Sequence, residues 1–196
     1  MKKFLVYMGH PAHFHLFRNM IKALQDDGFE VKVLIKTKDV LEELLKSSGI
    51  EYLNINTQER GKRKSAILLS LLKREWRFFS VARRFKPDLM IGTSAEIAHV
   101  GKLLNIPSIV VNEDDAQIVP YFAKVAYPFA SCILAPICTD TGRWQYKKVG
   151  YKGYHELAYL HPDHFKPDNL VVERVTGGDR YFLIRFAKLE AHHDEG

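Results

Sequence analysis

A short apolar run that passes through a glycine–proline turn into a helix pattern constrains the fold most. Phe4–Met8 is largely apolar, Gly9 to Pro11 interrupt it, and apolar residues then recur at helical spacing until Gly28. In α/β sheets the loop after a strand lines the ligand crevice, and the next helix presents free N–H groups to an anion. The start of the chain therefore predicts the first strand, loop and helix of such a sheet.

This first loop and the start of its helix carry three histidines, His10, His13 and His15. Imidazoles titrate near neutral pH, so they could exchange protons or contact a phosphate; the alternative is that they cap the helix or pack under the loop. No carboxylate or cysteine stands nearby, so no metal site is expected, and the glycine spacing of a dinucleotide-binding loop is absent. We expect Gly9 and His10 to bind substrate and His13 to act in catalysis.

The rest of the chain alternates strand patterns with helix patterns. A parallel sheet with right-handed crossovers follows from this alternation, so the fold class is α/β, a Rossmann-like parallel sheet with helices on both faces. The further strands are expected at residues 30–35, 51–55, 89–92, 108–111, 132–135 and 147–150.

Two later loops at expected strand ends carry polar groups. Gly92, Thr93 and Ser94 join a strand to a helix and form a second candidate anion-binding loop, with Ser94 as the helix cap. Residues 113–115 are three consecutive carboxylates, and crowding of like charges raises the pKa of at least one of them. We expect Glu113 and Asp114 to be catalytic; the alternative is a solvated turn in which Asp114 or Asp115 caps the next helix.

The net charge of +6 is concentrated in one segment, because residues 60–86 hold ten basic residues and a single acid. One interpretation is a core-facing helix with a solvated basic side, whose apolar face includes Leu72 and Trp76. The other is a surface for anionic phospholipid or a lipid-phosphate acceptor. No nucleic-acid-binding motif is present, so no nucleic-acid partner is expected. The expected membrane patch comprises Arg63, Lys64, Lys73, Arg74, Trp76 and Arg77.

Cysteine content and hydropathy bear on location. The two cysteines, Cys132 and Cys138, form no disulfide framework, which is typical of a reducing cytoplasm. No apolar stretch approaches the roughly 18 residues that span a bilayer, and the N-terminal apolar run is too short for a signal peptide. We expect a cytoplasmic protein or one that is peripheral at the inner face of the membrane.

Several stretches resemble an uncharacterised prokaryotic family of glycosyltransferase-like proteins related to the non-hydrolysing UDP-N-acetylglucosamine 2-epimerases. The most specific are Gly153–Leu160 (Gly-Tyr-His-Glu-Leu-Ala-Tyr-Leu) and Ala191–Asp194 (Ala-His-His-Asp). The loops at residues 9–13, 92–94 and 112–115, together with Arg185, complete the resemblance. These stretches are distributed over nearly the whole chain.

The resemblance implies a GT-B architecture, in which two Rossmann-like domains face each other across a cleft. It implies a nucleotide-sugar substrate, with a UDP-linked sugar expected, a sugar or lipid-linked acceptor, and no other cofactor. Residues 1–160 would form the N-terminal, acceptor-side domain, 161–180 a linker and 181–196 the start of a second domain. Arg185 and His193 would bind substrate there.

The second domain would be truncated, because its expected first strand, Tyr181–Phe186, is followed by only a short loop. The sequence therefore predicts the acceptor-side domain of a glycosyltransferase of surface polysaccharide or glycolipid synthesis, inactive unless its second domain is supplied. The alternatives are a UDP-sugar 2-epimerase-like enzyme and a non-catalytic partner subunit of a split GT-B enzyme.

Overall fold

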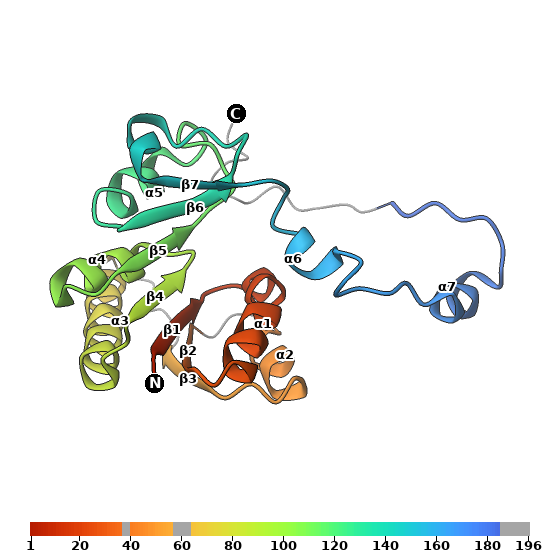
Figure 1. Ribbon diagram of the computed structural model, residues 1–196, viewed down its shortest axis with the longest axis horizontal. Coiled ribbons are helices and arrows are strands. Elements are labelled where there is room, and N and C mark those ends of the chain that lie inside the picture. Colours follow the sequence, from red (N-terminus) through yellow and green to blue (C-terminus); the bar gives the residue numbers. More distant parts are fainter. Residues whose placement is uncertain (37–39, 57–63, 185–196) are drawn as a thin grey trace.

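A computed structural model describes residues 1–36, 40–56 and 64–184, with only the backbone described for residues 56 and 64–71. This part of the chain forms seven strands and seven α-helices, which alternate from β1 to β6 (Figure 1). The strands are β1 (Lys3–Met8), β2 (Glu30–Lys36), β3 (Tyr52–Asn56), β4 (Leu89–Gly92), β5 (Ser108–Val111), β6 (Cys132–Pro136) and β7 (Lys148–Tyr151). The helices are α1 (Pro11–Asp26), α2 (Leu41–Ser47), α3 (Lys64–Phe85), α4 (Ala95–Leu104), α5 (Pro120–Ala126), α6 (Leu157–Leu160) and α7 (Asn169–Thr176), with a 3₁₀ helix at Gly142–Lys147.

All seven strands are parallel, in the order β3-β2-β1-β4-β5-β6-β7. The expected fold class, a Rossmann-like parallel sheet with helices on both faces, is thereby confirmed. The strand order reverses between β1 and β4, since β2 and β3 lie to one side of β1 and β4 to β7 to the other. The carboxyl ends of the strands at such a switch point form the usual ligand crevice of an open α/β sheet.

Side chains alternate between the two faces of the sheet, and a different set of helices covers each face. On one face, Val6, Met8, Val33 and Ile35 pack against α1 and α2. On the other, Leu5, Tyr7, Leu34 and Met90 pack against α3 and α4, and the neighbouring strands β5 and β6 pack against α4 and α5. Right-handed crossovers require this division, because the chain moves in opposite directions on the two sides of β1.

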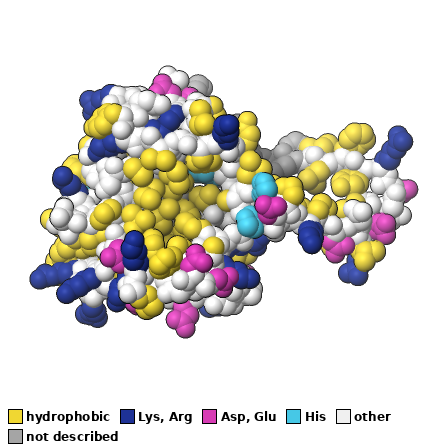
Figure 2. All heavy atoms as spheres, in the orientation of Figure 1, with side chains coloured by type: hydrophobic (Ala, Val, Ile, Leu, Met, Phe, Trp, Pro, Cys, Tyr) yellow, Lys and Arg dark blue, Asp and Glu magenta, His cyan; other side chains and the backbone are white. Residues whose placement is uncertain are grey.

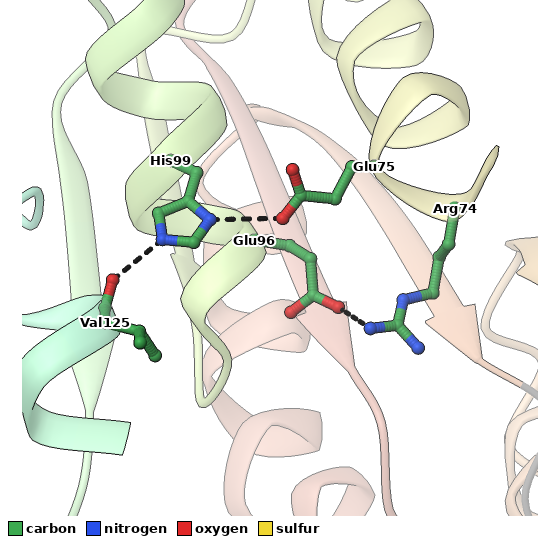
Figure 3. A network of polar contacts seen from close by, with 5 residues as sticks. All are labelled: Arg74, Glu75, Glu96, His99 and Val125. Atoms are coloured by element: carbon green, nitrogen blue, oxygen red, sulfur yellow. Dashed lines mark hydrogen bonds and ion pairs between the residues drawn. The ribbon is translucent and has the colours of Figure 1, made fainter. Parts of the chain in front are cut away.

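Polar contacts join α3, α4 and α5 on the second face (Figure 3). Arg74 on α3 forms an ion pair with the buried Glu96 on α4. His99, one turn further along α4, contacts Glu75 of α3 through Nδ1 at 3.1 Å and donates from Nε2 to the Val125 carbonyl at 2.7 Å. Since both ring nitrogens face acceptors, the geometry is that of the charged imidazolium.

Helix α3 buries a narrower face than the sequence predicts. Phe78 and Ala82 are fully buried, whereas Leu72 and Trp76 are 59% and 67% exposed. The prediction that Leu72 and Trp76 belong to the core-facing side of the helix is therefore wrong. Near these two residues the helix contacts α4 through the polar pairs of Arg74 and Glu75. Among the α3 side chains that the structure describes, from Leu72 onward, the buried apolar contact with the sheet begins at Phe78.

Beyond residue 160 the chain leaves the domain as an arm that carries α7 (Figure 1). This helix lies within the expected linker and has no buried residue. Residues 181–184, the described part of the expected strand Tyr181–Phe186, adopt no regular secondary structure and are exposed. A strand needs a hydrogen-bonded neighbour, and no described strand of the sheet pairs with this segment.

Candidate functional site

A cavity of about 250 Å³ opens at the switch point, at the carboxyl ends of β1, β4 and β5. Segment 155–159, which follows β7, forms its remaining wall and packs against α1, where Asn19 donates to the Ala158 carbonyl at 2.7 Å. We call this the polar pocket. It is lined by Ala12, His13, Leu16, Thr93, Val111, Asn112, Glu113, Asp114, His155, Glu156 and Tyr159.

Glu113 and His155 form the most defined pair of the polar pocket. His155 Nδ1 lies 3.3 Å from Glu113 Oε2, and the imidazole is 14% exposed while the carboxylate is 42% exposed. The Glu113 backbone is held as well, because its carbonyl accepts from the Thr139 hydroxyl at 2.9 Å. The imidazole thus fixes a carboxylate that remains open to the pocket, which is the arrangement of an oriented proton acceptor.

His13 lies across the pocket, in the first turn of α1. Its Nδ1 accepts from the Gly9 N–H at 3.1 Å, which leaves the proton on Nε2 in the neutral ring. Thr93 Oγ1 lies 2.9 Å from Nδ1 and 3.0 Å from Nε2. This histidine therefore connects the loops after β1 and β4. The two loops lie close together because β1 and β4 are adjacent strands of the sheet.

The three carboxylates after β5 diverge. Asp114 lines the polar pocket, and burial together with this carboxylate raises the pKa of the Tyr127 phenol to about 12. Asp115 turns away and accepts from the Asp140 N–H at 2.7 Å. Neither carboxylate caps α5, whose N-cap residue is Val119 with no side-chain cap.

The remaining residues of the two expected anion loops have different roles. His10 caps α1 by accepting from the Ala12 N–H at 3.2 Å, as the capping alternative predicts. Gly92 is fully enclosed, since a Cβ there would lie 2.8 Å from the Tyr7 carbonyl oxygen. Ser94 precedes α4 without a side-chain cap, and its buried Oγ finds no partner among the described residues.

The pocket does not include every residue that the sequence singled out. Arg185, His193 and Arg63 lie outside the described residues, as does the side chain of Lys64. On α3, Lys73 and Trp76 are exposed, Arg74 is engaged with Glu96, and Arg77 donates to the Ile55 carbonyl at 3.2 Å. These α3 residues lie on a different part of the molecule from the polar pocket.

His155 is the functional candidate that the site predictions missed. It belongs to the specific stretch Gly153–Leu160, but pattern alone does not show that the segment after the last strand returns to α1 and the β5 loop. In the described residues no group of three or more His, Cys, Asp or Glu side chains is placed to hold a metal ion. None of the helices in the described ranges combines the length and apolar character needed to cross a bilayer.

The chain belongs to the family described as "Protein of unknown function (DUF354)", whose profile matches residues 3–160. This range ends where the arm that carries α7 begins. None of the curated proteins matches the chain significantly in sequence.

Solved structures with a similar fold include a UDP-GlcNAc 2-epimerase, MurG and a glycosyltransferase. UDP-GlcNAc 2-epimerase from Neisseria meningitidis, bound to UDP-GlcNAc, matches with a TM-score of 0.64 and 15% identity over 90% of this chain and 52% of its own. MurG from Acinetobacter baumannii matches with a TM-score of 0.60 and 18% identity, over 77% of this chain and 45% of the MurG chain. A Streptomyces glycosyltransferase matches with a TM-score of 0.52 and 16% identity, over 69% of this chain and 50% of its own.

The chain spans about half the length of each of these structures. At such low identity the likeness concerns the fold. The predicted resemblance to GT-B glycosyltransferase-like proteins and UDP-N-acetylglucosamine 2-epimerases is confirmed at that level.

Proposed function

We propose that residues 1–160 are the acceptor-side domain of a GT-B sugar-nucleotide enzyme, a glycosyltransferase in surface polysaccharide or glycolipid synthesis. The observation that carries this proposal is the Glu113–His155 pair, which opens into a pocket at the switch point of the sheet. Support also comes from the similar folds, since one was solved with UDP-GlcNAc and another, from S. aureus, with UDP.

Glycosyl transfer to a hydroxyl needs a base that takes the acceptor's proton as its oxygen attacks the anomeric carbon. Glu113 is the base in this proposal, and His155 is a positioning residue that orients the carboxylate. The N-terminus of α1 adjoins the pocket at His13, and the loop before α4 adjoins it at Thr93, so the positive ends of these two helix dipoles favour the negative charge of a departing nucleotide.

The test is transfer from UDP-GlcNAc to candidate acceptors by the full-length protein as its own cells make it. Glu113→Gln keeps the shape of the side chain but removes the base, so we expect kcat to fall by about 10²–10⁴-fold. Glu51→Gln, at an exposed site before β3, is the matched control and is expected to leave the rate unchanged. Full activity of Glu113→Gln would refute the site.

An epimerase is the second candidate, because the 2-epimerase fold covers 90% of this chain against 77% for MurG. Inversion at C2 breaks and remakes a C–H bond, so it needs a proton acceptor and a proton donor on opposite sides of the sugar. Glu113 and His13, both in the pocket lining, would take these roles. Conversion of UDP-GlcNAc without an acceptor, with solvent deuterium incorporated at C2, would identify the epimerase.

A partner-subunit role is favoured by the exposed arm. Leu170, Val171 and Val175 on α7 are all more than half exposed, and the helix buries nothing against the domain. In this alternative α7 docks a separate catalytic chain that supplies the second GT-B domain. Stoichiometric co-purification of one chain, lost with Val175→Asp, supports this alternative, and a monomer that is active alone excludes it.

We also propose that the exposed part of α3 contacts an anionic membrane surface. Lys73 and Trp76 point to solvent beside Leu72, and the Trp76 ring stacks on Phe79 at 5.8 Å. Arg74 is excluded from this patch by its pair with Glu96. We expect flotation with vesicles containing phosphatidylglycerol to fall for Trp76→Ser but not for Tyr121→Ser, an exposed aromatic on α5. Equal flotation of both variants would contradict the proposal.

A further inference from the structure

A second, mainly apolar cavity of about 290 Å³ lies beside the polar pocket. Its walls are the side of α1, the strands β4 to β6 and the segment 151–158, represented by Phe17, Met20, Ile91, Leu134, Tyr151 and Leu157. Figure 2 shows hydrophobic side chains gathered over the middle strands of the sheet in this region. We call it the apolar pocket.

The topology explains why this cavity exists. The crossovers after β4 and β5 place α4 and α5 on the face of the sheet opposite to α1. On the face that carries α1, the described chain therefore places no long helix beyond α1 in the direction of β5 and β6. Ile109 and Leu134 therefore remain only partly buried at the margin of the α1 core. The short α6 segment covers this margin loosely and leaves a hollow.

The two pockets are adjacent. Leu16, Val111 and His155 line both of them, so His155 stands at the junction with Glu113 on its polar side. A single ligand can therefore place a polar group at Glu113 and an apolar group against Leu134. Together the cavities have the size of a small-molecule site and are much smaller than a protein interface.

Two buried polar atoms near this junction lack partners within the described part of the chain. They are the Tyr151 hydroxyl and His155 Nε2, on rings that stack at 6.4 Å with an interplanar angle of 14°. A buried polar atom without a hydrogen bond is costly, so a polar group of a ligand at the junction would be stabilised there. Burial and the nearby Glu113 raise the pKa of Tyr151 to about 12, so its hydroxyl remains a donor.

We propose that the apolar pocket binds the apolar part of an amphiphilic acceptor whose polar head lies in the polar pocket. This rests on the proposed function, because the head must be the group that receives the sugar. The occupant is a small amphiphile, such as a lipid-linked or alkyl-linked sugar. The size of the cavity and its position beside the pocket that contains Glu113 favour this occupant over a helix or a second copy of the chain.

The test is the affinity of the full-length protein for methyl, butyl, hexyl and octyl β-glucosides, measured by titration calorimetry below their micelle concentrations. The sugar head is constant in this series, so a difference reports the apolar pocket. We expect affinity to rise about two- to fourfold per added methylene until the pocket is filled. Equal affinity across the series would overturn the proposal.

Leu134→Gln should abolish the dependence on chain length, because it places an amide in the apolar pocket away from the catalytic groups. Leu103→Gln, on an exposed part of α4, is the control and should retain it. Thermal melts of both variants establish that they are folded. An equal dependence of affinity on alkyl chain length in the two variants would overturn the proposal. A concentration-dependent dimer that Leu134→Gln disrupts would also overturn it, because the cavity would then bind a second copy of the chain.

This experiment separates the inference from the proposed function. Loss of transfer in Glu113→Gln without any dependence on chain length means that the enzyme is correct and the apolar pocket is not its acceptor site. Dependence on chain length together with full activity of Glu113→Gln means that the pocket binds amphiphiles but the proposed catalytic site is wrong.

Discussion

Gly92 is required by the packing of the sheet, whatever it contributes to a ligand. A Cβ at this position would lie 2.8 Å from the Tyr7 carbonyl oxygen and 3.1 Å from Ile97 Cγ1. We expect Gly92→Ala to lower the free energy of unfolding by about 1–3 kcal/mol. Gly9→Ala, whose Cβ would meet nothing closer than 3.9 Å, should change it by only about 0.5 kcal/mol. Urea unfolding checks both, and equal effects would contradict the packing argument.

Lys147 is a second single residue on which local stability depends, because it holds the turn after α5. Its ammonium donates to the carbonyls of Tyr127, Pro128 and Ala130 at 3.0, 2.8 and 2.8 Å. Lys147→Met leaves these acceptors without their donor, so we expect about 1–2 kcal/mol of destabilisation. Lys124→Met, exposed on α5, is the control and should be nearly neutral. A neutral Lys147→Met would show that water replaces the ammonium.

At the scale of elements, the Glu75–His99 pair makes the α3–α4 contact dependent on pH (Figure 3). The hydrogen bond that His99 donates to Glu75 raises the pKa of His99 above its ordinary 6.5 and lowers the pKa of Glu75 below 4.5. Stabilisation by His99 is thus complete below pH 6.5 and is lost as pH rises through its raised pKa. Stabilisation by Glu75 is present above pH 4.5 and is lost as pH falls through its lowered pKa.

The pair therefore stabilises the fold most between about pH 4.5 and 6.5. We expect the difference in unfolding midpoint between the wild type and His99→Gln to be largest in this window and to shrink above it. His164→Gln, at an exposed position in the arm, serves as the control. A difference that is constant from pH 5 to 9 would rule out a contribution from the charged pair.

For the whole molecule, we propose that residues 1–160 fold as one unit to which the arm adds no stability. Residues 161–184 are exposed apart from the half-buried Thr176, and α7 buries no residue. Deletion of residues 165–184 should therefore change the free energy of unfolding by only about 0.5 kcal/mol. Urea unfolding of both chains tests this, and a marked loss of stability would assign the arm a packing role.

The sequence by itself determined the α/β class, the parallel sheet and all seven of the strands that the structure describes. Apolar strand runs and helical spacing are local signals, and the regular alternation of strands with helices favours parallel pairing. The same reasoning placed Gly9, Thr93 and Glu113 at carboxyl ends of strands, where the parallel arrangement brings them together. Local signals also predicted a strand at Tyr181–Phe186, but a strand forms only beside a neighbour, and no strand in the described part of the chain pairs with residues 181–184.

Only the tertiary structure decided which of these residues meet. His155 lies 42 positions after Glu113, and its contact depends on how the segment beyond β7 returns to α1. The burial of Arg74 against Glu96 and the exposure of Trp76 depend on how α3 is rotated against α4, which helical periodicity leaves open. The apolar pocket follows from the handedness of the crossovers, which places α1 and α2 on one face of the sheet and α3, α4 and α5 on the other, and leaves β4 to β6 partly uncovered beside α1.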